Sequence, residues 1–228
     1  MKLLIKFPTK GRKEQFFTVL DRYYEYLSGK HDFQFIITID SDDAQMSLCQ
    51  DEFDKYKNLL VYCSNNKSKI EAINKGVELC PDWDVLLLAS DDMIPIAERY
   101  DDIIIRNMKQ YFPDTDGVLW FNDGYRGQEI NTLAIIGRKY YDRFGYIYHP
   151  DYNSVYCDDE FTQVSKMLNK VKYFHQPIIR HEHPNNNRGV AFDERYRHTE
   201  SFYFLDRQTF ERRKSNNFYV PEYSHINA

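Results

Sequence analysis

The feature that most constrains the fold is a short apolar run that ends in two acidic residues. Five consecutive apolar residues, Val85 to Ala89, are followed by Ser90, Asp91 and Asp92. The run has the length of a strand and shows no polar alternation, which predicts a strand covered on both faces of a parallel sheet. In open α/β sheets, ligands gather at the carboxyl ends of such strands. Adjacent carboxylates there are costly unless paired, solvated or holding a cation. The motif therefore predicts either a divalent-metal site that carries a diphosphate or a solvated turn that caps a helix over 97–112.

Apolar runs that alternate with helical stripes predict βαβ units in the first half of the chain. The predicted strands span 3–7, 33–39, 59–63 and 85–89, and the helical patterns between them fall within 16–27, 44–56 and 66–79. This alternation indicates right-handed crossovers and a doubly wound layer. No GxGxxG turn and no Walker lysine loop follows a strand, which excludes the dinucleotide-binding and P-loop interpretations. Acidic residues end the second and fourth strands instead, at Asp40 and at Asp91-Asp92.

The second half of the chain adds aromatic and acidic segments to the same pattern. We predict strands at 117–121, 132–136, 171–174 and 177–180, and helices at 138–144, from 158 onwards and at 193–214. Segment 145–156 contains four tyrosines that follow neither a helical nor a strand periodicity, which suits an ordered loop over a groove. Asp158, Asp159 and Glu160 open a helix, where the dipole favours acidic residues, so the cluster is either a cap or a catalytic group. His181 and His183 can point to one face of a strand.

Composition limits the class of protein. The 228 residues suit one domain, and the formal net charge of −5 gives no basic field for nucleic acid. The cysteines are far apart and form no CxxC pair, which favours a reducing compartment. Residues 1–7 are too short for the apolar region of a signal peptide, and no apolar run reaches transmembrane length. We therefore expect a soluble, cytoplasmic protein without a transmembrane segment.

Taken in order, these motifs resemble the GT-A nucleotide-sugar glycosyltransferases, particularly the family 2-like ones. Phe7-Pro8-Thr9-Lys10-Gly11-Arg12 resembles their opening strand and Pro-Thr/Ser-x-x-Arg turn, which holds the base. Lys69, Ala72 and Asn74 resemble the helix that faces the nucleotide. Ser90-Asp91-Asp92 resembles the DxD motif, with serine in place of the first aspartate. The resemblance covers residues 1 to about 200.

The resemblance implies a three-layer α/β/α sandwich with a central, mostly parallel sheet, formed by one domain over residues 1–228. Residues 1–95 would be the nucleotide-binding half, and residues 96–228 the acceptor-binding half with the C-terminal helix. It implies a divalent metal, Mn²⁺ or Mg²⁺, held by Asp92, His181 and His183. The general base would be Asp159, with Asp158 as the alternative. The residues implied for nucleotide-sugar binding are Pro8, Thr9, Lys10, Arg12, Asp40, Asp42, Lys69, Asn74, Ser90 and Asp91.

The implied reaction is transfer of a sugar from a nucleoside diphosphate sugar, with UDP the most expected carrier, to a hydroxyl of a glycan or other acceptor. The metal would neutralise the departing diphosphate, and the carboxylate would take the acceptor proton with inversion. A nucleotidyltransferase would need a glycine-rich loop that Pro8-Thr9-Lys10 does not offer. A nuclease is disfavoured by the net charge of −5. A non-catalytic sugar-nucleotide-binding protein would keep Asp40 and Asp91 without needing the acidic cluster at 158–160.

Overall fold

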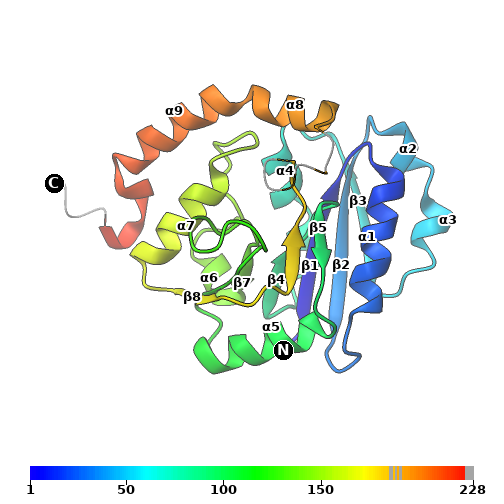
Figure 1. The fold of residues 1–228 in the computed structure, drawn as a ribbon, viewed down its shortest axis with the longest axis horizontal. Helices are drawn as coiled ribbons and strands as arrows, with labels where there is room; N and C mark the ends of the chain where they lie inside the picture. The colour runs from blue at the N-terminus through cyan, green and yellow to red at the C-terminus, as the bar shows by residue number, and fades with distance from the viewer. Residues whose placement is uncertain (185–186, 188, 190–191, 224–228) are drawn as a thin grey trace.

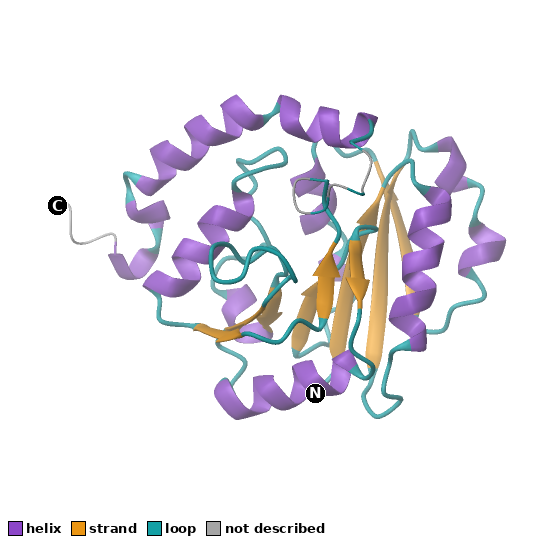
Figure 2. Ribbon diagram, in the orientation of Figure 1, coloured by secondary structure: helices purple, strands orange, loops and turns teal. Residues whose placement is uncertain are grey.

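The computed structural model describes residues 1–184, 187, 189 and 192–223. Within these residues a seven-stranded sheet has the order β3-β2-β1-β4-β7-β6-β8, and a two-stranded sheet pairs β5 with β9 (Figure 1). Helices lie on both sides of the large sheet (Figure 2). The fold is therefore the predicted three-layer α/β/α arrangement with a mostly parallel central sheet.

The first half of the chain forms the predicted parallel layer. Its elements are β1 (Leu3–Thr9), α1 (Lys13–Glu25), β2 (Phe33–Asp40), α2 (Ala44–Ser47), α3 (Gln50–Phe53), β3 (Leu59–Ser64), α4 (Lys69–Asn74), the 3₁₀ turn η1 (Val77–Leu79) and β4 (Val85–Leu88). The helix predicted over 44–56 is two short helices, and the one predicted over 66–79 ends at Asn74. Gly76 explains the second break, because its φ of 86° is left-handed and a Cβ there would lie 3.3 Å from the Tyr62 ring.

The second half adds the remaining strands and the C-terminal helices. Its elements are β5 (Met93–Pro95), α5 (Tyr100–Tyr111), β6 (Val118–Phe121), β7 (Ile135–Gly137), α6 (Arg138–Asp142), α7 (Cys157–Met167), β8 (Val171–Phe174), β9 (Ile179–His181), α8 (Glu194–Ser201), α9 (Tyr203–Lys214), η2 (Asn217–Tyr219) and η3 (Pro221–Tyr223). The helix predicted over 97–112 begins only at Tyr100, directly after Arg99, whose φ of 62° is left-handed and not helical. The final helix predicted over 193–214 is interrupted at Phe202. In the part of the chain that is described, no helix combines the length and apolarity needed to cross a bilayer.

Two apolar layers hold the helices against the sheet. On one face, α1 and α5 pack on alternate residues of β1, among them Leu3, Ile5 and Phe7. On the other face, α4, α7 and α9 pack around Leu4, Ile36 and Leu86. This alternation is expected for a strand buried on both faces, and the two layers fix the carboxyl ends of β1, β2 and β4 relative to one another.

Candidate functional site

A pocket of about 980 Å³, open to solvent, lies at the carboxyl ends of β1, β2 and β4, between the start of α4 and α8. It forms here because parallel strands end at the same edge of a sheet. Helix α8 contributes Tyr196, His198 and Thr199, which the sequence did not indicate. The predicted residues that line the pocket are Pro8, Thr9, Lys10, Arg12, Asp40, Lys69, Ser90, Asp91, Asp92 and His183.

Asp40 lies at the end of the pocket formed by β1 and β2. Its carboxylate is 2.6 Å from Lys10 Nζ and accepts a hydrogen bond of 2.5 Å from Asn66 Nδ2. Partial burial lowers the pKa of Lys10, but hydrogen bonds to Asp40 and Asp42 outweigh that effect and raise it. Asp42 is largely exposed and is not among the lining residues of the pocket. Its contact with the site is the ion pair with Lys10, which does line the pocket.

Arg12 joins the end of β4 to the start of α8. Its Nη1 donates to Asp91 Oδ1 at 3.0 Å, and its Nε and Nη2 donate to the Asp193 carboxylate at 3.0 and 2.9 Å. The guanidinium also lies over the Tyr196 ring, 4.3 Å from its centroid. Burial and the neighbouring Asp92 raise the pKa of Asp91 to about 6, although Arg12 opposes the shift. The predicted nucleotide ligand Arg12 thus also closes the pocket by holding α8.

Asp92 is buried just after β4, across β1 from Asp40 at the end of β2. It accepts hydrogen bonds from Ser90 Oγ and, over 3.2 Å, from the Tyr196 hydroxyl, and its Oδ2 lies 3.6 Å from His181 Nε2. Burial favours a raised pKa for Asp92, but the charge and hydrogen bond of His181 lower it overall. The same contact raises the pKa of His181 in spite of its burial. Burial and His181 lower the pKa of His183 to about 4, which favours its neutral imidazole.

The chemistry of these groups fits a divalent cation, although they do not form a closed protein cage. Within residues 1–184, 187, 189 and 192–223, no three His, Cys, Asp or Glu side chains are gathered closely enough to hold a metal ion. Asp92 offers a carboxylate oxygen and His181 an imidazole nitrogen beside it. Cations such as Mg²⁺ are commonly held by one or two carboxylates that are completed by substrate phosphates. The residues present therefore suit a metal that arrives with a diphosphate.

A second, smaller pocket of about 470 Å³ shares Pro8, Lys69 and Ser90 with the first. Asp158 and His181 also line it, whereas Asp159 is not among its lining residues. Burial raises the pKa of Asp158. Burial and the negative charge of Asp158 raise the pKa of Asp159 to about 6. The predicted acidic cluster therefore divides, with one carboxylate lining the pocket and the other outside it.

Asn74 lies outside both pockets, so a role in nucleotide contact is not supported. Its Oδ1 accepts from the backbone N–H groups of Ile147 and Tyr148 at 2.9 and 3.2 Å, and its Nδ2 donates to the Tyr148 carbonyl at 2.7 Å. The Asn74 side-chain amide is therefore hydrogen-bonded to the backbone of the tyrosine-rich loop 145–156. Asn74 positions this loop beside α4.

No protein-family model matches the chain, and no curated protein matches its sequence. Solved structures match its fold at 13–14% identity. A mannosyltransferase from Pyrobaculum calidifontis, solved with GDP-Man and Mn²⁺, matches 77% of this chain and 54% of its own, with a TM-score of 0.62. Residues 1–349 of TarS from S. aureus match 82% of this chain and 62% of theirs, with a TM-score of 0.61. The chain thus spans less than two thirds of these two proteins.

A β1,4-galactosyltransferase 7 from Drosophila, solved as a mutant with manganese, UDP-Gal and xylobiose, matches 85% of this chain and 77% of its own, with a TM-score of 0.54. At these identities the likeness concerns the fold. It agrees with the mostly parallel sheet. The chain has the GT-A fold of the nucleotide-sugar glycosyltransferases.

Proposed function

We propose that the chain is a glycosyltransferase that moves a sugar from a nucleoside diphosphate sugar to an acceptor hydroxyl. The observation that carries this proposal is a pair of adjacent pockets whose linings share Pro8, Lys69 and Ser90. Asp40 lies at one end, Asp91 and Asp92 lie in the middle, and Asp158 lies in the second pocket. A nucleotide sugar has its base, its diphosphate and its anomeric carbon in the same order. The reaction requires these parts and a base to be aligned, which the arrangement supports.

The donor would bind with its base against Asp40 and Asn66 and its ribose near Asp91. Lys69 lines both pockets and acts electrostatically on Asp91, Asp92 and Asp158, so its ammonium is suited to the diphosphate between them. The structural neighbours were solved with GDP-Man, UDP-GlcNAc and UDP-Gal. We propose a UDP-sugar for this chain.

Asp92 and His181, with His183 nearby, would hold Mn²⁺ or Mg²⁺. Such an ion would supply Lewis-acid neutralisation of the departing diphosphate. Ser90 and Tyr196 fix the Asp92 carboxylate by donating hydrogen bonds to it.

Asp158 is the general base that the pockets favour, and Asp159 is the alternative that the motif favours. Asp158 lines the second pocket together with Ser90, next to the point where the sugar would lie. Its burial raises its pKa, which makes the carboxylate a stronger proton acceptor near neutral pH. Attack from the side opposite the diphosphate would invert the anomeric configuration. The acceptor would be a glycan or another hydroxyl compound that reaches this pocket.

The test combines binding with turnover. Thermal unfolding is followed with UDP-Glc, UDP-Gal, UDP-GlcNAc and GDP-Man, with and without Mn²⁺, and release of nucleoside diphosphate by slow hydrolysis is measured for each. A metal-dependent rise in the unfolding midpoint together with release supports the enzyme. Binding without release at any pH would favour a non-catalytic sugar-nucleotide-binding protein. Neither binding nor release with the whole panel would overturn the proposal.

A further inference from the structure

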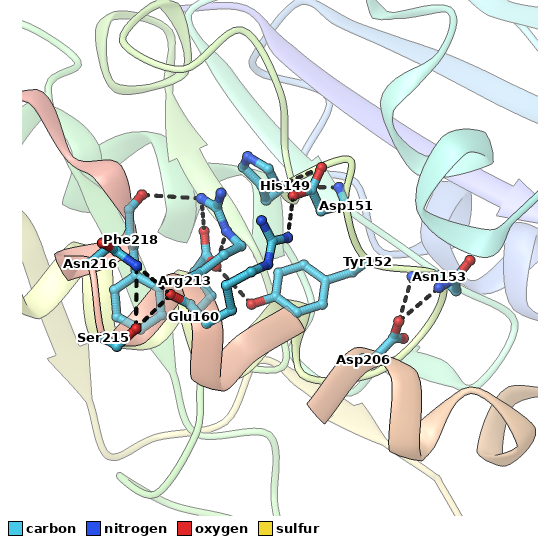
Figure 3. Close-up of polar contacts among 11 residues, drawn as sticks. His149, Asp151, Tyr152, Asn153, Glu160, Asp206, Arg213, Ser215, Asn216 and Phe218 are labelled. Carbon is cyan, nitrogen blue, oxygen red and sulfur yellow. Dashed lines mark hydrogen bonds and ion pairs between the residues drawn. The ribbon is translucent and has the colours of Figure 1, made fainter. Parts of the chain in front are cut away.

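The helix α9 contains a buried aspartate whose carboxylate accepts four hydrogen bonds from one loop. Asp206 is fully buried, and its Oδ1 accepts from the backbone N–H and the side-chain Nδ2 of Asn153, each at 2.9 Å. Its Oδ2 accepts from the N–H groups of Ser154 and Val155 at 2.8 and 2.9 Å. Figure 3 shows the two contacts between Asp206 and Asn153. Hydrogen bonds to an ionised acceptor are about twice as strong as neutral ones. Asp206 therefore fixes three consecutive backbone units of this loop.

Seven residues later, the same helix makes a second buried anchor. Arg213 donates from Nε and Nη2 to the two carboxylate oxygens of Glu160, at 2.7 and 2.8 Å, and from Nη2 to the Phe218 carbonyl at 3.1 Å. The Tyr152 hydroxyl donates to Glu160 Oε2 at 2.7 Å (Figure 3). Both Arg213 and Glu160 are buried. A spacing of seven places Asp206 and Arg213 on one face of the helix, two turns apart.

The two anchors enclose the stretch of chain that lines the second pocket. Segment 153–160 begins at the residues bound by Asp206 and ends at the residue bound by Arg213. Between these ends lie Ser154, Cys157 and Asp158, which line the pocket. Tyr156, in the same stretch, has a left-handed φ of 62°, a conformation that a non-glycine residue keeps only when its surroundings hold it. One rigid helix thus fixes both ends of the segment that bears the proposed base.

We propose that Asp206 and Arg213 are positioning residues, which set the place of the Asp158 carboxylate by holding segment 153–160 against α9. The inference rests on the proposed function. A buried ion pair such as Arg213–Glu160 can often be replaced by apolar residues without loss of stability, so stability alone does not account for it. A placement error of about 1 Å in a catalytic group can cost about 100-fold in rate. Glu160 belongs to this anchor, and its carboxylate is engaged by Arg213 and Tyr152.

The test separates positioning from stability. Asp206→Asn turns one accepting oxygen into a donor that faces N–H groups, and Arg213→Lys keeps the charge but loses the two-pronged contact. Arg212→Gln is the matched control, because Arg212 is next to Arg213 but forms an exposed ion pair with Asp151 at 2.9 Å. For each variant, kcat and KM for UDP release from the UDP-sugar that the wild type hydrolyses fastest are measured, and the Kd for UDP with Mn²⁺ is determined by calorimetry.

We expect kcat to fall about 10- to 100-fold in Asp206→Asn and Arg213→Lys. The Kd for UDP should stay within about twofold, since neither residue lines the nucleotide pocket. Arg212→Gln should match the wild type in both quantities. If Asp206→Asn and Arg213→Lys lower only the unfolding midpoint and keep the wild-type kcat well below that midpoint, the role is structural and the proposal fails.

A measurement on the wild type decides the question where a variant does not fold. Amide hydrogen exchange at Asn153, Ser154 and Val155 should be as slow as in the core of α7, because Asp206 accepts their N–H groups. Exchange at the rate of an exposed loop would overturn the inference whether or not the enzyme is active. Failure of the proposed function has a different signature, namely a wild type that neither binds UDP nor releases it from the panel.

Discussion

The Tyr196 hydroxyl donates a hydrogen bond of 3.2 Å to Asp92 Oδ2, across 104 residues of sequence. This contact brings α8 over the end of β4, and Arg12 holds it there through Asp193. The pocket at the strand ends is therefore built from both halves of the chain. The sequence predicted the part of the pocket that the ends of β1, β2 and β4 form. The part formed by α8 belongs to the half of the chain that was predicted to bind the acceptor.

Removal of the Asp92 carboxylate should abolish the metal dependence of nucleotide binding. Asp92→Ala removes the carboxylate that His181, Ser90 and Tyr196 surround. We expect UDP with Mn²⁺ to raise the unfolding midpoint of the wild type and to leave that of Asp92→Ala unchanged. The exposed residue Asp82 provides the control, and Asp82→Ala should respond like the wild type. A metal-dependent shift that persists in Asp92→Ala would place the cation elsewhere.

Asp40→Ala should weaken binding of every nucleotide that carries the preferred base. The carboxylate lies at the pocket end near Pro8 and Thr9, and a lost charge-assisted hydrogen bond costs about 1–3 kcal/mol. Calorimetric titration with uridine, UDP and a UDP-sugar measures the loss, which should be the same for all three. Equal affinities in the two proteins would show that Asp40 does not contact the base.

Asn variants at 158 and 159 identify the base. The residue that acts as base should lose about 10²- to 10⁴-fold in turnover while donor affinity is retained. A carboxylate that only caps α7 should instead cost about 1 kcal/mol of stability with turnover unchanged. Wild-type rates in both variants would make the cluster structural. The base would then be sought at Asp123, although its carboxylate already accepts from Tyr125, Arg126 and Thr132.

The pH dependence of kcat/KM provides an independent check of the base. A general base must be deprotonated, so activity falls as the pH drops through its pKa. Burial raises the pKa of both candidates, so the loss should occur at a higher pH than for an ordinary aspartate, and near pH 6 if Asp159 is the base. Measuring kcat/KM between pH 4 and 8 shows this fall of activity on the acidic side. Full activity at pH 4 would contradict a base with a raised pKa.

Lys6 should make the stability of the protein depend on pH above neutrality. It is fully buried in β1, donates to Thr38 Oγ1, and burial lowers its pKa to about 7 despite the opposing charge of Glu78. Between pH 7 and about 10, the unfolded chain binds more protons at this lysine than the folded protein does, so stability rises with pH. The slope is at most about 1.4 kcal/mol per pH unit.

Lys6→Met should remove this rise, as measured by urea unfolding at pH 7, 8 and 9. Below pH 7 lysine is protonated in both states, and its contribution no longer changes with pH. The same pH dependence in wild type and variant would mean that Lys6 keeps an ordinary pKa in the fold.

The parallel layer could be predicted because its signals are local. Continuous apolar runs such as Val85–Ala89 and the helical stripe after 13 specify strands buried on both faces and their crossovers. The same reasoning passed over Lys6, because one lysine in a short strand can face water. In the fold Lys6 is buried on the same face of β1 as Leu4, which packs with Ile70 and Ile73 of α4.

Contacts between distant segments account for what the sequence did not reveal. Asn74 was assigned to the nucleotide, but the backbone of Ile147 and Tyr148 requires its amide. The pairing of β5 with β9 depends on residues more than 80 positions apart, including Met93 and His181. The break at Phe202 lets α8 cover the pocket while α9 holds segment 153–160, and no local signal marks it.

The pairing of β4 with β7 has a consequence for how a donor can enter. Leu86 and Leu87 of the first half are hydrogen-bonded in register with Ile136 and Ile135 of the second half. A hinge between the two halves would have to break this ladder inside the apolar core. We therefore expect the halves to move as one rigid body. The contacts of Arg12 with Asp193 and of Tyr196 with Asp92, which hold α8 over the strand ends, lie outside this ladder.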